Sequence, residues 1–191
     1  MSVYLISVYV HIVGALGLFA ALGLEWALLT NLRRASTSLQ VREWLGLSAG
    51  IRRLGGLAAL ALLVTGIYMS TVAWGRQPWI GLGLLGLLLM AGLGRTLSGT
   101  RIGAMARILS PDDGPLTAAM HGRLRDPVLL LSAWIRTALG LGIVFIMSAK
   151  PGPGIALSTV LIALALGLVA GARAWSGQRG AALSGAPFTN R

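Results

Sequence analysis

Five runs of apolar residues constrain the fold of this 191-residue chain more than any other feature. The runs cover residues 3–30, 55–74, 78–94, 127–148 and 154–173. Most of them approach or exceed the ~20 residues that a helix needs to cross a lipid bilayer. A soluble domain of this length has too small an interior to bury so many apolar faces. The sequence therefore predicts an all-α integral membrane protein, a transmembrane helical bundle with five spans.

The domain organisation follows from the same pattern. We expect residues 1–175 to form a single transmembrane domain. Residues 176–191 are rich in glycine and serine and contain no apolar run, which is typical of a loosely ordered terminal segment. We expect this segment to be a flexible cytoplasmic tail.

The distribution of lysine and arginine predicts the orientation in the membrane. Thirteen of the 16 basic residues fall after the first run, after the third run or in the tail. Two others, Arg76 and Lys150, fall in the short connections between, and Arg136 lies within a run. Cytoplasmic loops carry the excess of basic residues, so the N-terminus is predicted outside and the C-terminus in the cytoplasm. Because the charges alternate with the spans, they predict contact with membrane lipids and no binding of nucleic acid.

The connections contain signals for shorter helices. "SLQVREWLG" fits a short amphipathic helix with Ser38 as its N-cap. A start signal at residues 113–115 predicts a surface helix that leads into the fourth span, with a break near Pro127. The third span is short, and Trp79 and Arg95 are expected to anchor its two ends.

Two charged residues stand within the predicted spans. Arg136 lies nine residues after Pro127, roughly 13 Å along a helix from the inner surface. Glu25 lies five residues before Thr30, roughly 8 Å from the same surface, and the arginine side chain can reach down across the difference. Charges in membranes are tolerated when they pair or face the bundle interior, so we expect a buried ion pair between Glu25 and Arg136. Two interpretations stay open. The pair either fixes the helix arrangement or serves a function, such as handling an anion or a proton or contacting a lipid headgroup.

His11 is the one histidine within a predicted span, and it shares a helix face with Glu25, 14 residues further on. Tyr68 and Met69 are expected at a similar depth in the second span, so the three residues form a candidate ligand site. A histidine and a methionine together can ligate haem iron or copper(I). Two interpretations stay open: His11 is a hydrogen-bonded interior residue, or it contacts haem, copper or quinone. No cofactor is favoured, and the metal is unknown.

Small residues recur at four-residue spacing on two predicted helices. Gly17 and Ala21 form one ridge, and Ala163, Gly167 and Gly171 form another. Such ridges let membrane helices approach closely. They are expected either to pack inside the bundle or to meet another subunit.

Signatures of catalysis are absent from the sequence. The chain has no cysteine, which excludes disulfides, thiolate metal sites and a cysteine nucleophile. It has no Walker-type loop, no paired carboxylates in a span, and no acid, histidine and serine at one depth. An enzyme is therefore the less favoured class.

Two stretches resemble a known family. "YVHIVGALGLFAAL" and "RTALGLGIVFIMSAKPG" are similar to an uncharacterised family of small bacterial integral membrane proteins, distantly similar to the copper-resistance D type. The resemblance implies a small helical bundle in a bacterial inner membrane. It carries over one residue for copper, His11. Fifteen arginines against one lysine fit a GC-rich bacterial genome.

Three classes of function are consistent with these observations. The favoured one is an accessory or scaffold subunit of a larger membrane complex, with other membrane proteins as partners, because ionisable groups in the spans are few. The second is a small transporter or metal-handling protein that uses the His11 and Glu25 face. The third is a redox protein that binds haem or quinone near His11.

Overall fold

The computed structural model describes residues 2–109 and 113–183, with side chains up to residue 176 in the last helix. All elements of these residues are helical. They are α1 (Val3–Arg34), α2 (Ser38–Met69), η1 (Ser70–Trp74), α3 (Pro78–Leu93), η2 (Gly94–Gly99), α4 (Thr100–Ile108), α5 (Ala118–Leu124), α6 (Pro127–Ala149) and α7 (Pro153–Leu183). Five helical segments are long and apolar enough to cross a membrane, which confirms the all-α class and the five candidate spans.

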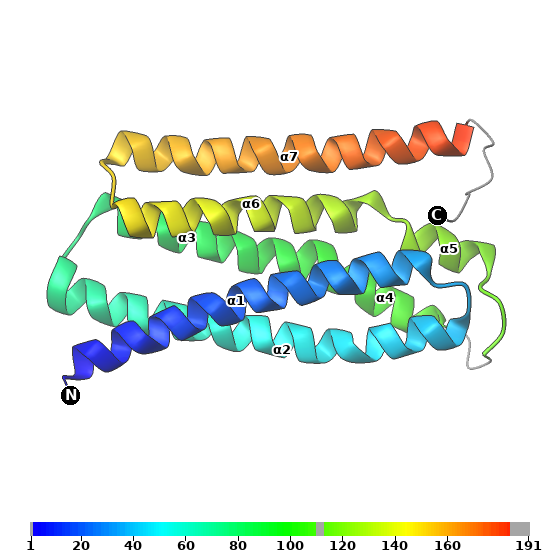
Figure 1. Ribbon diagram of the computed structural model, residues 1–191, viewed down its shortest axis with the longest axis horizontal. Coiled ribbons are helices and arrows are strands. Elements are labelled where there is room, and N and C mark those ends of the chain that lie inside the picture. Colours follow the sequence, from blue (N-terminus) through cyan, green and yellow to red (C-terminus); the bar gives the residue numbers. More distant parts are fainter. Residues whose placement is uncertain (1, 110–112, 184–191) are drawn as a thin grey trace.

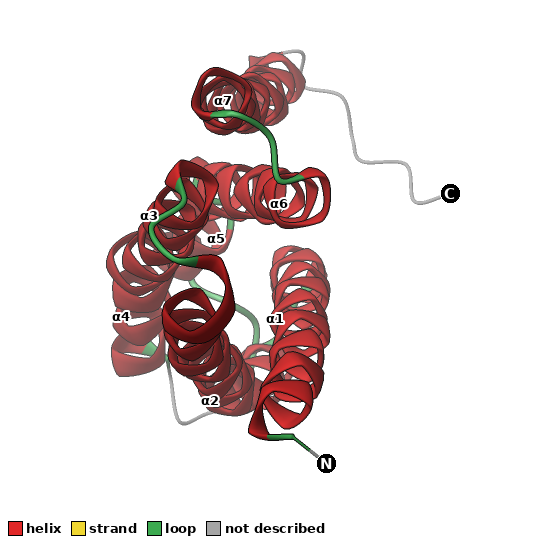
Figure 2. Ribbon diagram, turned by 90° about the vertical axis from the view of Figure 1, so that its left-hand side faces the viewer, coloured by secondary structure: helices red, strands yellow, loops and turns green. Residues whose placement is uncertain are grey.

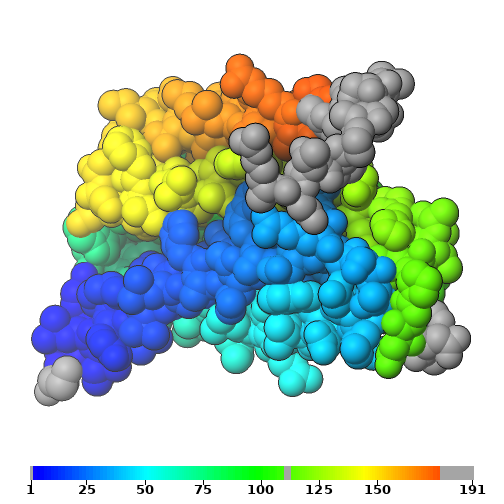
Figure 3. Space-filling view, turned by 45° about the vertical axis from the view of Figure 1, so that its right-hand side comes forward, coloured from blue at the N-terminus to red at the C-terminus, as the bar shows by residue number. Residues whose placement is uncertain are grey.

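The five long helical segments form a bundle in which successive segments run antiparallel (Figure 1). An end-on view shows α7 on one side, α6 and α3 in the middle, and α1 and α2 on the other side (Figure 2). The surfaces of α1 and α2 adjoin along their length (Figure 3). The α1–α2 turn, α5 and the C-terminal end of α7 lie at one end of the bundle, opposite the N-terminus (Figure 1). The arginine-rich connections thus share one end, while membrane insertion and orientation stay predictions.

The second span begins earlier than the sequence suggested. A separate amphipathic helix was expected before a span at residue 55, but α2 is continuous from Ser38. Its N-cap is Thr37, whose side chain accepts a hydrogen bond from the Gln40 backbone N–H. Val41 and Leu45 are buried in the core at the arginine-rich end, and no proline interrupts the helix. The amphipathic segment is therefore the first part of the spanning helix.

The third span is longer than expected. α3 does not end near Arg95 but continues through the π-helical turn η2 and through α4 to Ile108. Arg95 accordingly lies within a continuous helical segment and does not mark its end. Trp79 is 9% exposed and packs edge-on against Trp74, with ring centroids 5.6 Å apart. Because π-helical turns occur often at functional sites, η2 is a candidate part of such a site.

The loop helix and the fourth span begin at capping residues. α5 begins at Ala118 with Thr117 as its N-cap, so the expected start at residues 113–115 was wrong. α6 begins at Pro127, where the Asp126 carboxylate accepts a 2.9 Å hydrogen bond from the Val128 backbone N–H. The predicted break at Pro127 is therefore present, as the boundary between two helices.

α7 extends beyond the predicted end of the fifth span. It runs to Leu183, so residues 176–183, which were expected to belong to a loose tail, are helical. The remainder of the predicted tail, residues 184–191, lies outside the described residues.

Candidate functional site

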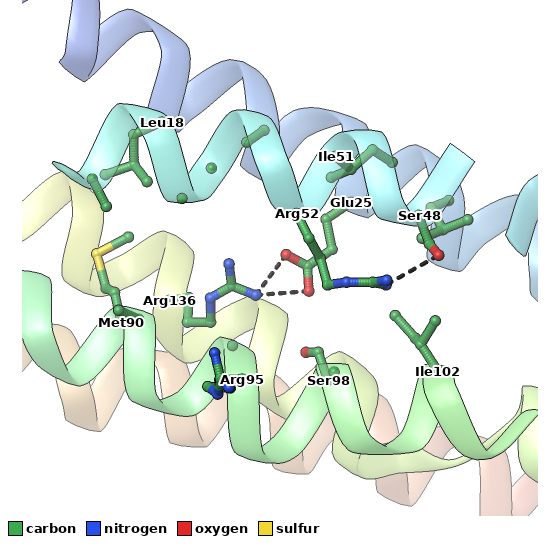
Figure 4. Close-up of a pocket in the computed structure, with 18 of the residues that line it drawn as sticks. Leu18, Glu25, Ser48, Ile51, Arg52, Met90, Arg95, Ser98, Ile102 and Arg136 are labelled. Carbon is green, nitrogen blue, oxygen red and sulfur yellow. Dashed lines mark hydrogen bonds and ion pairs between the residues drawn. The ribbon is translucent and has the colours of Figure 1, made fainter. Parts of the chain in front are cut away.

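The structure brings Glu25 of α1 and Arg136 of α6 together inside the bundle. Nη1 of Arg136 lies 2.7 Å from Oε1 and 2.5 Å from Oε2 of Glu25. Both side chains are largely buried, with 9% of Glu25 and 15% of Arg136 exposed. The guanidinium points across a cavity at the carboxylate (Figure 4). The geometry is that of a charge-assisted hydrogen-bonded pair, which is shorter and stronger than a neutral one.

The pair is held in place by contacts one residue further along each helix. Nε1 of Trp26 donates a 3.0 Å hydrogen bond to Oγ1 of Thr137. The Trp26 ring also packs edge-on against Trp134, with centroids 4.9 Å apart. These contacts fix α1 against α6 at the level of the ion pair, so the pair does not have to hold the two helices together alone.

Glu25 engages a single nitrogen of Arg136. Both carboxylate oxygens accept from Nη1, so the parallel two-nitrogen fork that arginine can offer to a carboxylate is not used here. Nε of Arg136 is buried and has no hydrogen-bond partner among the described residues. Buried polar groups are normally satisfied, and an exception calls for an explanation, such as a ligand or a water.

A cavity of about 560 Å³ surrounds the pair, between α1, α2, the α3–η2–α4 segment and α6. Two further arginines line it, Arg52 from α2 and Arg95 from η2 (Figure 4). Nη1 of Arg52 donates a 3.1 Å hydrogen bond to Oγ of Ser48, and Arg95 has no hydrogen-bond or ion-pair partner in the described chain. Three guanidinium groups therefore share one cavity with one carboxylate, Glu25.

Sequence reasoning missed Arg52 and Arg95 as site residues. Both had been counted with the loops, because the spans were drawn from residue 55 and up to residue 94. The missing signal was helix continuity, since no proline separates either arginine from its apolar run. Once each helix is extended, both arginines fall within candidate spans.

His11 lies apart from this cavity. Its Nδ1 is 2.9 Å from Oγ1 of Thr65 on α2, and it also packs against Gly66. Tyr68 and Met69 are half-buried on the following turn of α2, with no hydrogen bond to His11. His11 and Glu25 are 14 residues apart, about 21 Å along α1, so they do not form one site. The described residues contain no cluster of three or more His, Cys, Asp or Glu able to hold a metal.

Both small-residue ridges pack within the chain. A methyl group built on Gly17 would lie 3.4 Å from Cβ of Ala58, and one on Gly55 would lie 3.4 Å from Cβ of Ala21. On α7, Ala163 contacts Gly142, while a methyl on Gly167 would lie 2.6 Å from Cα of Ile135. Gly171 likewise faces Leu131 of α6. The ridges thus pack α1 against α2 and α7 against α6.

Comparison of this chain with known proteins found no relative. No family model, no curated protein and no solved structure matches the chain. The resemblance to the copper-resistance D type stays a prediction.

Proposed function

We propose that this protein is a multi-pass membrane protein that binds an anion in the cavity lined by Arg52, Arg95 and Arg136. The observation that supports the proposal is the excess of cations: three guanidinium groups and one carboxylate in a single cavity. Binding of this kind belongs to a small transporter or a lipid-handling protein. We further propose that the protein resides in a bacterial inner membrane, as the resemblance implies.

The energetics of the bundle favour a bound anion. A central arginine costs roughly 2.5–3.5 kcal/mol on insertion scales, and partners inside the protein reduce this cost. Of the three arginines Arg136 is largely buried, whereas Arg52 and Arg95 are exposed at the edge of the cavity. Glu25 neutralises one of the three arginines through the 2.5–2.7 Å contacts of Arg136. The other charges remain without an acidic partner from the described residues in this cavity. An anion between Arg95 and Arg136 would supply one, because guanidinium groups match carboxylate and phosphate oxygens.

The proposal is tested by anion-dependent stabilisation of the purified protein in dodecyl maltoside. Phosphate, sulfate and succinate are added at constant ionic strength against chloride, and the Tm is measured. A ligand at concentration c that binds only the folded state stabilises it by RT ln(1 + c/Kd), so the Tm rises with the logarithm of the concentration once this exceeds the Kd. We expect at least one of these anions to raise the Tm of the wild type.

Matched arginine variants provide the control. Arg52→Gln and Arg95→Gln should abolish the anion-dependent rise, and Arg53→Gln should retain it. Arg53 is adjacent to Arg52 on the exposed surface of α2 and does not line the cavity, so it controls for net charge. Equal responses from all four proteins would show that the anions act on the general surface charge, and would refute the proposal.

A second candidate function, an accessory subunit of a membrane complex, is supported by a groove of about 540 Å³ between α6 and α7. Its lining is almost entirely apolar and includes the exposed Leu141, Phe145 and Leu166. Small residues form its floor, which suits a membrane helix of another protein. Cysteines introduced at Phe145 and, as a control, at Leu57 on α2 test this. A companion cross-linked from Phe145→Cys but not Leu57→Cys supports docking, whereas equal or absent products contradict it.

A further inference from the structure

We infer that the ligand of the arginine cavity is an anionic membrane lipid, with its phosphate at the arginines and an acyl chain along the apolar part of the cavity. This inference rests on the proposed function and names its ligand class. Three features of the cavity favour such a ligand: the order of residues along its walls, its opening between two helices, and its position relative to the ends of the bundle.

At one end of the cavity the wall is apolar on three helices, and charged side chains follow in the same direction, with Leu28, Ile51 and Ile102 lining the wall beside or beyond them. On α1 the order is Leu18, Ala21 and then Glu25; on α2, read in reverse, it is Ala59 and then Arg52. On the α3–η2 segment it is Leu87, Met90 and then Arg95. Seven or eight residues separate the apolar and charged positions, about 10–12 Å along each helix. Figure 4 shows Leu18 and Met90 at one side of the ion pair and Arg52 at the other.

A water-soluble anion would contact the charged part of the cavity and leave its apolar part uncovered. The charged part contains serine and threonine hydroxyls as well as guanidinium groups, contributed by Ser48, Ser98 and Thr100. The apolar part contains aliphatic and thioether side chains, which gain by covering a hydrocarbon chain. A molecule with an anionic head and an apolar chain complements both parts at once.

The cavity opens sideways between α2 and α3. Gly56 on α2 and Ala91 on α3 both line the cavity and are both exposed. A methyl group built on Gly56 would meet no atom within 4 Å. In a bundle that spans a membrane, this side faces lipid, so a lipid has direct access without crossing water.

The charged end of the cavity points toward the arginine-rich end of the bundle. Arg52 follows the α1–α2 turn by 15 residues, and Arg95 precedes the connection that ends at Pro127. Phospholipids place their phosphates at the membrane surface and their chains toward the middle, which is the same order as in the cavity. A lipid of the leaflet at the arginine-rich end would therefore enter with its head toward that end and its chain toward the middle of the bundle.

Lipid binding is tested by native mass spectrometry of the full-length protein, with phosphatidylglycerol, phosphatidylcholine and inorganic phosphate as probes. Dodecyl maltoside serves as the neutral amphiphile. Charge-assisted hydrogen bonds to the head should give phosphatidylglycerol about tenfold higher affinity than phosphatidylcholine. Arg95→Gln should remove this preference, and Arg53→Gln should retain it.

A pair of glycine variants tests the apolar part and the opening. Gly56→Leu places a side chain at the lateral opening, and Gly92→Leu adds the same side chain on α3 outside the cavity. Neither position has an atom within 4 Å of an added methyl group, so both variants are expected to fold. Gly56→Leu should lower phosphatidylglycerol occupancy severalfold without changing the Arg95-dependent response to phosphate, whereas Gly92→Leu should change neither.

The outcomes separate this inference from the proposed function. If phosphate stabilises the protein through Arg95 but phosphatidylglycerol shows no preference over phosphatidylcholine, the cavity binds a soluble anion and the lipid inference is wrong. If no anionic probe, soluble or lipid, depends on Arg95, both are wrong. If Gly56→Leu and Gly92→Leu lower lipid occupancy equally, the lipid binds the general surface and the inference is also wrong.

Discussion

Gly94 lies directly against the guanidinium group of Arg136. A methyl group built on Gly94 would stand 2.9 Å from Cζ and 3.2 Å from Nε of that arginine. Gly94 is the first residue of η2, so the π-helical turn presents a bare backbone to the group that binds Glu25. A side chain at this position would meet the guanidinium in the place where it binds Glu25.

Replacement of Gly94 by alanine should therefore displace Arg136. We expect Gly94→Ala to lower the stability of the folded protein by about 1–3 kcal/mol, the usual cost of overpacking. Gly92→Ala, two residues earlier and free of neighbours within 4 Å, should be neutral or stabilising, because alanine is the better helix former. Thermal unfolding in detergent measures both variants. Equal effects would mean that the guanidinium accommodates the methyl group.

The ion pair itself is tested by a double-mutant cycle with Glu25→Gln and Arg136→Gln. Removing one partner leaves a buried charge, so each single variant should lose about 3–5 kcal/mol, and the double variant should lose less than the sum. Unfolding in detergent supplies the three differences. Strictly additive losses would show that the two side chains are not coupled in the membrane protein.

The predicted orientation is tested by cysteine labelling, which is clean because the chain has no cysteine of its own. Gln77 lies in the short connection after η1, and Gly122 is exposed on α5 at the opposite end of the bundle. In intact cells an impermeant maleimide should label Gln77→Cys but not Gly122→Cys, until the membrane is opened. Labelling in the reverse order would invert the topology.

The role of His11 is decided by spectroscopy and metal analysis. Protein isolated gently from its own membrane should carry a chromophore or a bound metal if His11 is a ligand, and His11→Ala should remove it. Thr65→Val provides the matched variant, since it deletes the hydroxyl 2.9 Å from Nδ1 and keeps the histidine. Colourless, metal-free protein would leave His11 as a hydrogen-bonded packing residue.

Sequence alone determined the features that depend on local composition. Apolar runs of sufficient length predict five helices, because a chain in lipid has to satisfy its backbone hydrogen bonds internally and a helix does so within one segment. The Glu25–Arg136 pair was also within reach of the sequence, since the first span has one acid, the fourth has one base, and an arginine side chain covers their difference in depth. The helix ends were predicted less well. No local signal near Ser38 or Arg95 tells whether the polar segment beside an apolar run continues the same helix or forms a separate element.

Only the tertiary structure decided which residues share the cavity. Arg52 and Arg95 lie on helices that are distant in sequence from Arg136, and their approach depends on the way in which α2, η2 and α6 pack. Packing also gave His11 and Glu25 different neighbours, since His11 turns to Thr65 of α2 while Glu25 turns to Arg136 of α6. The register of one helix against another is set by side-chain shape along the whole contact, such as the fit of Gly167 on Ile135, and a linear sequence does not contain it.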